Sequence, residues 1–284
     1  MLSAHPSISI SSEGAYIYHV RSKLYSYGDL SDSTNLEALH RDILPFLHDE
    51  KWLSPPAFEE LLGWARKYGT GLRSIMTFYG TWEAQVVGKK ELIWWGDNAP
   101  YHVHSVPYFH SLFPECKFIL MIRDPRDVYT SIKFNYKDPY PLSDVMGLWE
   151  KALLDGLLAE LFLGCSRVKK VRYEDLVTRP TSQLREICEF LGVEYKEEML
   201  SYYQSDPARA LSQIKHHANV VEPVFPSSVG KYHQMLTKEE IHLINQRLSS
   251  PLKCLGYLSE DESKEGHVKQ SVEIVEGDAP FSSR

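Results

Sequence analysis

Short apolar runs alternate along the chain with longer segments whose apolar residues recur every three or four positions. Apolar or β-branched runs of about four to eight residues are typical of buried strands, and the longer spacing is typical of helices with one buried face. The pattern predicts strands at 7–11, 92–95, 117–122 and 168–173. It predicts helices at 35–48, 56–67, 72–87, 104–113, 142–163, 181–191 and 238–248. Strands that alternate with helices of this length imply right-handed crossovers, so we expect an α/β fold with three layers, a mainly parallel sheet flanked by helices.

The segment 117–132 joins a strand directly to a helix. Its apolar run ends at Arg123, Asp124 suits the N-cap of a helix, and Pro125 suits the first helical turn. Such a junction brings backbone donors, a helix N-terminus and charged side chains to the edge of the sheet where open α/β folds bind nucleotides. The same residues are compatible with a buried strand whose end is closed by an Arg–Asp pair. The residues alone leave both interpretations open.

The composition limits the class of protein. The chain has 284 residues and 43% hydrophobic content, which suffices for one large core, and no Pro/Gly/Ser-rich linker divides its middle. We therefore expect one domain at 1–257, followed at 258–284 by an acidic, polar segment that predicts a disordered tail. The net charge of −7 argues against a nucleic-acid-binding protein. No run approaches the roughly twenty apolar residues of a membrane span.

The cysteines and histidines predict neither disulfides nor a metal site. The cysteines are widely separated and form no C-x-x-C pair: Cys116, Cys165, Cys188 and Cys254. This usage is typical of thiols in a reducing compartment, so we expect a cytoplasmic protein. The candidate metal ligands are two histidine pairs, His102 with His104 and His216 with His217. Neither pair has i, i+4 spacing with a neighbouring acid, so no metal is expected.

The run KFILMIRDPRDVYTSI at 117–132 resembles the 3′-phosphate-binding segment of sulfotransferases that use 3′-phosphoadenosine-5′-phosphosulfate (PAPS). Residues 1–257 can be laid along that family, and they are most similar to the branch that holds bacterial sulfotransferases and the tyrosylprotein sulfotransferases. The resemblance implies a fold like that of P-loop NTPases, in which Arg123 and Ser131 hold the 3′-phosphate. The chemistry agrees, because arginine can fork onto two phosphate oxygens and a serine about two helical turns later adds a neutral donor.

Two later segments extend the resemblance. In VRYEDLVTRP, Tyr173 matches a tyrosine that packs near the adenine of the donor, and its alternative role is to cap the core. The run SSVGKY at 227–232 resembles the loop that closes over the 3′-phosphate. There Gly230 would allow close backbone approach and Lys231 would supply charge. Gly-Lys pairs are also common in surface loops, so that interpretation stays open.

The resemblance is less complete on the transfer side. The sequence begins at MLSAHP, just after the place where the family carries a first strand and a Gly- and Ser/Thr-rich loop for the 5′-phosphosulfate, so we expect that strand and loop to be missing. The resemblance assigns the catalytic base to Glu13, and the alternative is an idle surface glutamate at a strand end. Asn98 stands where the family commonly has a lysine that donates charge to the sulfuryl group, so stabilisation of the transition state there would be weaker.

The sequence therefore predicts a PAPS-dependent sulfotransferase that gives adenosine 3′,5′-bisphosphate and a sulfate ester. Two alternatives remain: a catalytically inactive nucleotide-binding or scaffold protein of the same fold, and a different α/β enzyme such as a phosphotransferase. The expected partner is a hydroxyl-bearing acceptor, which can be a small molecule, a sugar or a tyrosine, and the oligomeric state is open. Several aromatic residues could line an acceptor cleft, although core packing is the favoured role: Tyr16, Tyr18, Tyr25, Tyr27, Phe78, Tyr79 and Trp82.

Overall fold

The strands of the protein form two parallel pairs. The computed structural model describes residues 1–11, 21–47, 54–205 and 220–259. In this part of the chain, β1 (Ile8–Ser11) pairs with β2 (Trp94–Asp97), and β3 (Phe118–Ile122) pairs with β4 (Val168–Arg172). Both pairings are parallel, which confirms the α/β class and the parallel strands. The single continuous sheet that the sequence predicts is wrong for these residues, because no ladder hydrogen bonds join the two pairs.

The two strand pairs are joined by side chains instead of by backbone hydrogen bonds. Ile8 of β1, Ile119 of β3 and Val171 of β4 belong to one apolar cluster with Ile187 and Leu191 of helix α9 (Pro180–Leu191). A ladder requires strands about 4.8 Å apart, whereas side-chain packing tolerates a wider separation. The cluster therefore keeps the two pairs on the same face of α9 without making them one sheet.

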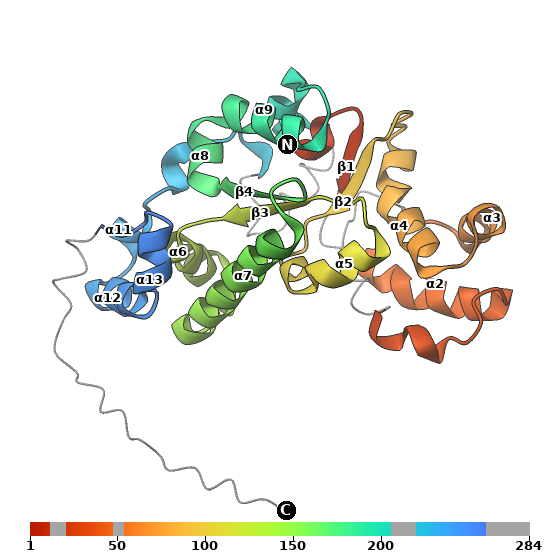
Figure 1. Cartoon of the computed structure of the whole chain (residues 1–284), viewed down its shortest axis with the longest axis horizontal. Coiled ribbons are helices and arrows are strands. Elements are labelled where there is room, and N and C mark those ends of the chain that lie inside the picture. The colour runs from red at the N-terminus through yellow and green to blue at the C-terminus, as the bar shows by residue number, and fades with distance from the viewer. Residues whose placement is uncertain (12–20, 48–53, 206–219, 260–284) are drawn as a thin grey trace, which may run out of the picture.

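Helices cover both faces of the β3–β4 pair (Figure 1). Successive strand residues point to opposite faces, so Leu120 and Ile119 contact different helices. Leu120 packs with α5 (Val106–Leu112) and α7 (Leu142–Leu163), whereas Ile119 packs with α9. Figure 1 shows α5 and α7 on one side of these strands, and α8 (Tyr173–Thr178) with α9 on the other. The three-layer arrangement is therefore present around this pair.

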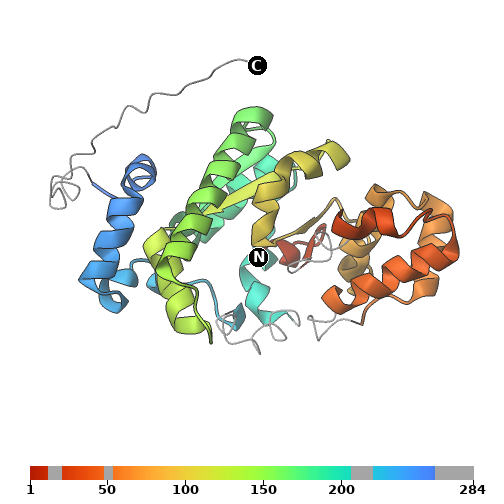
Figure 2. The ribbon, with the colours of Figure 1, turned by 90° about the horizontal axis from the view of Figure 1, so that it is seen from below.

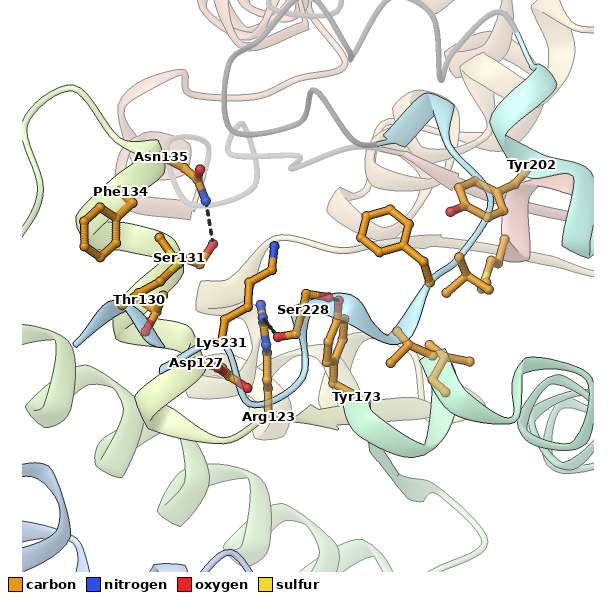
Figure 3. A pocket seen from close by; sticks show the side chains of 16 residues that line it. Arg123, Asp127, Thr130, Ser131, Phe134, Asn135, Tyr173, Tyr202, Ser228 and Lys231 are labelled. Atoms are coloured by element: carbon orange, nitrogen blue, oxygen red, sulfur yellow. Dashed lines mark hydrogen bonds between the residues drawn. The ribbon is translucent and has the colours of Figure 1, made fainter. Parts of the chain in front are cut away.

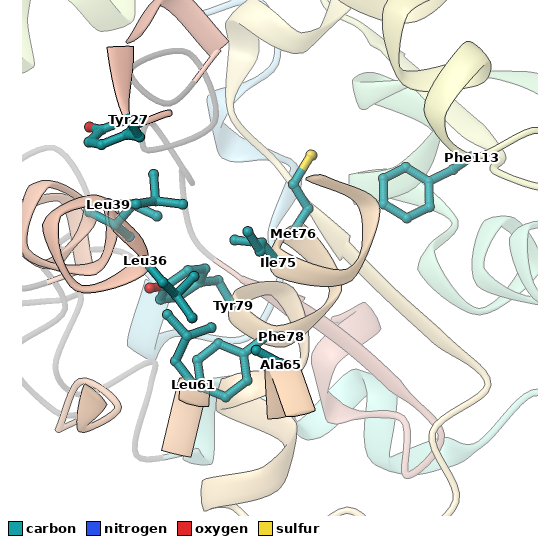
Figure 4. Packing of buried hydrophobic residues seen from close by; sticks show 11 residues of the cluster. Tyr27, Leu36, Leu39, Leu61, Ala65, Ile75, Met76, Phe78, Tyr79 and Phe113 are labelled. Atoms are coloured by element: carbon teal, nitrogen blue, oxygen red, sulfur yellow. The ribbon is translucent and has the colours of Figure 1, made fainter. Parts of the chain in front are cut away.

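A helical bundle forms one end of the molecule (Figure 2). It consists of α2 (Ser33–Leu47), α3 (Phe58–Tyr68) and α4 (Leu72–Val86), close to the helices predicted there. Its core contains the aromatic side chains Tyr27, Phe78 and Tyr79, which are all buried (Figure 4). These three side chains are therefore core residues. Trp82 is partly buried against the same cluster, and Tyr25 is 96% exposed. Tyr16 and Tyr18 lie outside the described residues.

At the opposite end of the molecule, the last helices pack against α6 (Pro125–Asn135) and α7. These helices are α11 (Tyr232–Met235), α12 (Lys238–Arg247) and α13 (Ser249–Cys254). Tyr129 of α6 and Ile244 of α12 lie in their shared core. Leu258 is also buried in that core, one residue beyond the predicted end of the domain. Residues 260–284, most of the predicted tail, lie outside the described residues.

Short helical turns complete the described fold. They are η1 (Leu2–Ala4), η2 (Leu24–Ser26), η3 (Pro100–Ser105), η4 (Glu197–Gln204) and η6 (Pro226–Ser228). Part of the helix predicted at 104–113 belongs to η3. No helix of the described ranges combines the length and apolar character needed to cross a membrane.

Two predicted strands have different bounds in the structure. The strand expected at 92–95 begins at Trp94 and continues to Asp97, because Gly96 and Asp97 still pair with β1. The strand expected at 168–173 ends at Arg172, and Tyr173 is the first residue of α8. Tyr173 thus leaves the sheet at its carboxyl edge, the edge where Arg123 also emerges from β3.

Candidate nucleotide-binding site

A cavity of about 440 Å³ opens at the carboxyl edge of β3. Five segments that are distant in sequence line it: Met1, the β3–α6 junction with α6, helix α8, the end of η4 and residues 224–235. The four residues that the sequence assigns to the nucleotide all lie on its wall (Figure 3): Arg123, Ser131, Tyr173 and Lys231. The fold therefore brings the candidate donor-binding residues together. Their contact with a nucleotide remains a prediction.

Contacts of both its backbone carbonyl and its guanidinium group hold Arg123 at the cavity. The indole nitrogen of Trp149 donates a hydrogen bond to the Arg123 carbonyl oxygen over 3.0 Å. The guanidinium carbon lies 4.3 Å from the centre of the Tyr173 ring, and Nη2 donates to the Ser228 carbonyl oxygen over 3.0 Å. Arg123 Nε is buried and has no hydrogen-bond partner among the described residues. A stacked guanidinium with an unused buried donor is well suited to bind an oxyanion.

The Arg–Asp pair that the sequence suggested at the strand end involves a different arginine. Asp124 caps α6 by accepting a hydrogen bond from the Arg126 amide over 2.9 Å. The same carboxylate accepts from Arg126 Nη2 over 2.7 Å, and both side chains are buried. Arg126 thus satisfies Asp124 and leaves the Arg123 guanidinium for the cavity. A buried Arg–Asp pair and an arginine that lines the cavity are both present, at neighbouring positions.

Ser131 lies two turns along α6 and faces the same space (Figure 3). Its hydroxyl oxygen is 3.3 Å from the Asn135 amide nitrogen, which can donate to it. A hydroxyl that accepts one hydrogen bond can still donate its own proton to a ligand. The neighbouring Thr130 hydroxyl is used within the helix, where it donates to the Arg126 carbonyl oxygen over 2.8 Å. Ser131 is therefore the α6 hydroxyl that is suited to meet a phosphate.

The segment 226–232 closes this end of the cavity. The Tyr173 and Ser228 hydroxyls are 2.7 Å apart and share a hydrogen bond. Gly230 has a φ of +73°, a left-handed conformation that favours glycine. The turn at Gly230 brings the Lys231 side chain to the cavity wall, close to Arg123 in Figure 3. The Gly-Lys pair is therefore part of the cavity and not of a remote surface loop.

The other end of the cavity is apolar and aromatic. Its wall contains Leu176 and Val177 of α8, Tyr202 of η4, and Phe225. Figure 3 shows Tyr202 on the side away from Ser131. Burial raises the pKa of the Tyr202 hydroxyl, as expected beside apolar neighbours. Leu176 and Val177 lie in the segment VRYEDLVTRP, where only Tyr173 was expected at the nucleotide. Tyr202 and Phe225 belong to no local motif, and only the fold places them beside Tyr173.

The predicted transfer residues are described only in part. Glu13 lies outside the described residues. Asn98 is exposed and directly follows β2. The preceding Asp97 carboxylate accepts hydrogen bonds from the Ala99 amide over 2.8 Å and from His102 Nε2 over 2.5 Å, when that nitrogen carries the proton. The backbone on both sides of Asn98 is therefore held at the end of the strand.

The candidate metal ligands are engaged in pairwise contacts. His102 contacts Asp97, and His104 contacts Asp155. His216 and His217 lie outside the described residues. The described ranges contain no group of three or more His, Cys, Asp or Glu side chains that could hold a metal ion.

Comparisons with known proteins place the chain among sulfotransferases. Protein-tyrosine sulfotransferase 2 of Gallus gallus is 30% identical over 142 residues, which are 47% of this chain and 38% of the relative. Protein-tyrosine sulfotransferase A of Caenorhabditis elegans is 28% identical over 168 residues, 56% of this chain and 43% of the relative. The chain thus spans less than half the length of these two relatives.

The fold has a counterpart among solved structures. The sulfotransferase domain from the Synechococcus PCC 7002 olefin synthase superposes with a TM-score of 0.58 and 23% identity, covering 86% of each chain. This likeness concerns the fold. The model of the family described as "Sulfotransferase family" matches residues 1–197, which include Arg123, Ser131 and Tyr173. The chain belongs to the sulfotransferase family.

Proposed function

We propose that this chain transfers a sulfuryl group from PAPS to a hydroxyl acceptor. The observation that carries the proposal is the cavity of about 440 Å³ with two different ends. Two cationic side chains and a serine hydroxyl lie at one end, and aromatic and apolar residues lie at the other. A nucleotide has the same division, with phosphate at one end and a flat base at the other. Membership of the sulfotransferase family supports the assignment of the nucleotide to PAPS.

Each end of the cavity has a proposed role in donor binding. The guanidinium of Arg123, the ammonium of Lys231 and the hydroxyl of Ser131 bind the 3′-phosphate through charge-assisted and neutral hydrogen bonds. Tyr202 and Phe225 contact the purine, and Tyr173 contributes its ring between the two ends. Because Tyr173 also stacks on Arg123, it couples the orientation of the phosphate-binding group to the position of the base.

The transfer step resembles phosphoryl transfer in its geometric demands. The acceptor oxygen attacks sulfur in line, the new S–O bond forms as the bond from sulfur to the 5′-phosphate oxygen breaks, and adenosine 3′,5′-bisphosphate leaves. The proton of the acceptor hydroxyl passes to the carboxylate of Glu13. Asn98 donates a hydrogen bond to the sulfuryl group, where an amide stabilises developing negative charge less than a lysine would.

The acceptor is a hydroxyl group, and the relatives make tyrosine the first one to test. Two of them carry the name protein-tyrosine sulfotransferase. A sugar or a small alcohol is the alternative acceptor. The candidate cleft residues Tyr27, Phe78 and Tyr79 belong to the core of the bundle formed by α2, α3 and α4, so they favour neither class of acceptor. Labelled-sulfate transfer to a tyrosine-containing peptide and to a sugar distinguishes the two.

Arg123→Ala tests the proposed donor site. We expect the affinity for adenosine 3′,5′-bisphosphate, measured by calorimetry, to fall by roughly 10- to 150-fold, because a hydrogen bond to a charged group contributes about 1.5–3 kcal/mol. Arg66→Ala on the exposed surface of α3 is the matched control and should bind normally. Unchanged affinity in Arg123→Ala would remove this arginine from the site, and equal binding of ATP would favour a phosphotransferase.

Glu13→Gln separates the catalytic proposal from a non-catalytic nucleotide-binding protein. The variant keeps the size of the side chain and removes the proton acceptor, so labelled-sulfate transfer from PAPS should be lost while nucleotide affinity stays near that of the wild type. Retained transfer activity would rule out Glu13 as the base. Absence of transfer in the wild-type chain, together with normal nucleotide binding, would favour the non-catalytic alternative.

A further inference from the structure

Asp127 in the first turn of α6 accepts hydrogen bonds from the backbone on both sides of Lys231. Asp127 Oδ2 accepts a hydrogen bond from the Gly230 amide over 2.7 Å, and Oδ1 accepts from the Tyr232 amide over 3.0 Å. The Asp127 side chain is buried, with 2% of the residue exposed. One carboxylate thus bridges the amides of the residues that precede and follow the lysine.

We propose that Asp127 is a positioning residue that fixes the backbone at Gly230 and Tyr232, so that the Lys231 ammonium reaches the 3′-phosphate of the nucleotide. This inference rests on the proposed function and deepens it. Asp127 also lines the cavity, but its carboxylate is used by backbone amides and therefore acts on the ligand through Lys231.

A second contact from the same helical turn also holds Tyr232, the residue after the lysine. The Arg126 guanidinium carbon lies 4.2 Å from the centre of the Tyr232 ring, and Tyr232 is buried. Arg126 is itself anchored by Asp124, the N-cap of α6. The residues before and after Lys231 are thus tied to one rigid element, and the lysine side chain is left to extend along the cavity wall (Figure 3).

The chemistry of a carboxylate explains why aspartate is suited to this position. Its two oxygens accept from two amides at once, whereas an asparagine would direct an NH₂ group at one of them. Burial raises the pKa of Asp127, and the two amides and the nearby Arg123 charge act in the opposite direction. A lysine has a long flexible stem, so a fixed backbone reduces the conformational freedom that is lost when its ammonium binds phosphate.

A double-mutant cycle tests whether Asp127 acts through Lys231. Calorimetry with adenosine 3′,5′-bisphosphate would compare the wild type, Asp127→Asn, Lys231→Met and the double variant. We expect each single substitution to weaken binding about tenfold, and the double variant to bind within about twofold of Lys231→Met. Asp144→Asn on the exposed first turn of α7 is the matched control and should bind as the wild type does.

Other outcomes would overturn the inference. If the two effects multiply to about a hundredfold, or if Asp127→Asn binds normally, Asp127 does not work through the lysine.

If Asp127→Asn folds poorly, Gly230→Ala is a second variant that distorts the same turn, because alanine disfavours a φ of +73°. Its effect must then also disappear in the Lys231→Met background. The wild type in the same assay separates the two proposals. If it does not bind adenosine 3′,5′-bisphosphate, the proposed function and this inference both fail. If it binds and the effects of the cycle multiply, only this inference fails.

Discussion

Individual side chains of this protein owe their chemistry to burial. Glu83 lies on α4 and is 8% exposed, and burial raises the pKa of its carboxyl to about 7, with the Lys89 charge acting in the opposite direction. Lys89 in turn donates hydrogen bonds to the carbonyl oxygens of Ser3 over 2.6 Å and His5 over 3.1 Å. Neither residue stands out in the sequence, because a glutamate on a helix and a lysine in a turn are ordinary surface residues until the fold encloses them.

The raised pKa of Glu83 predicts a stability that falls with rising pH. The folded protein keeps this proton up to about pH 7, whereas the unfolded chain loses it near 4.5. The contribution of Glu83 to the free energy of unfolding is therefore largest below about pH 4.5 and declines through pH 7, by on the order of 3 kcal/mol. Between pH 5 and pH 8, the free energy of unfolding measured in urea should fall less in Glu83→Gln than in the wild type. In Glu189→Gln, at an exposed position, it should fall as much as in the wild type. Equal pH dependence in both variants would contradict the shift.

Pairs of elements approach closely where the sequence supplies glycine. Gly80 of α4 lies against Trp95 of β2, and a Cβ atom placed on Gly80 would be 2.2 Å from the indole ring. Gly63 of α3 has no heavy atom within 4 Å of the corresponding position. Both glycines lie in helix interiors, where glycine is a poor helix former, so only the contact with β2 distinguishes them.

Alanine substitutions at these two glycines should have opposite effects. Gly80→Ala forces the Trp95 ring to move, and overpacking of this kind typically costs about 1–3 kcal/mol, more than the helix propensity returns. Gly63→Ala should stabilise the protein by roughly 0.5–1 kcal/mol. Chemical denaturation measures both changes. A Gly80→Ala protein as stable as Gly63→Ala would show that α4 and β2 are not in close contact.

The candidate nucleotide-binding cavity is formed by segments from the whole length of the molecule, and no single segment could form it. Its wall combines Met1, the β3–α6 junction with α6, helix α8, η4 and residues 224–235, and the C-terminal helices pack against α6. A ligand bound there faces five separate segments of the chain. Ligand binding should therefore stabilise the molecule as a unit.

Adenosine 3′,5′-bisphosphate should raise the thermal unfolding temperature. A ligand that binds only the folded protein stabilises it by about 2.7 kcal/mol at a hundred times its Kd, which corresponds to several degrees for a chain of this size. Differential scanning fluorimetry with and without the nucleotide measures the shift. At the same nucleotide concentration, the shift should fall to about half or less in Arg123→Ala and persist in Arg66→Ala. A wild-type protein whose unfolding temperature does not respond would contradict nucleotide binding at this cavity.

Much of the local structure could be predicted because its causes lie within a few residues. The strand before Arg123, the N-cap at Asp124 and the proline at the first turn of α6 were expected and are present. The long helix expected at 142–163 is α7. The predicted ends of two strands were wrong because they depend on neighbouring elements. Strand β2 continues to Asp97 because it pairs with β1, and β4 ends at Arg172 because Tyr173 begins a helix.

The sequence by itself determined the element types and the strand-to-helix junction, because apolar periodicity and capping act along the chain. Its resemblance to the sulfotransferase family pointed to four candidate donor-binding residues, Arg123, Ser131, Tyr173 and Lys231. Only the tertiary structure decided that Asp124 pairs with Arg126 and that Asp127 holds the turn at Lys231. It also decided that the strands form two pairs and that Tyr202 and Phe225 complete the cavity. Hydrogen-bond partners and burial depend on residues that are far apart in sequence, and the folded chain alone brings those residues together.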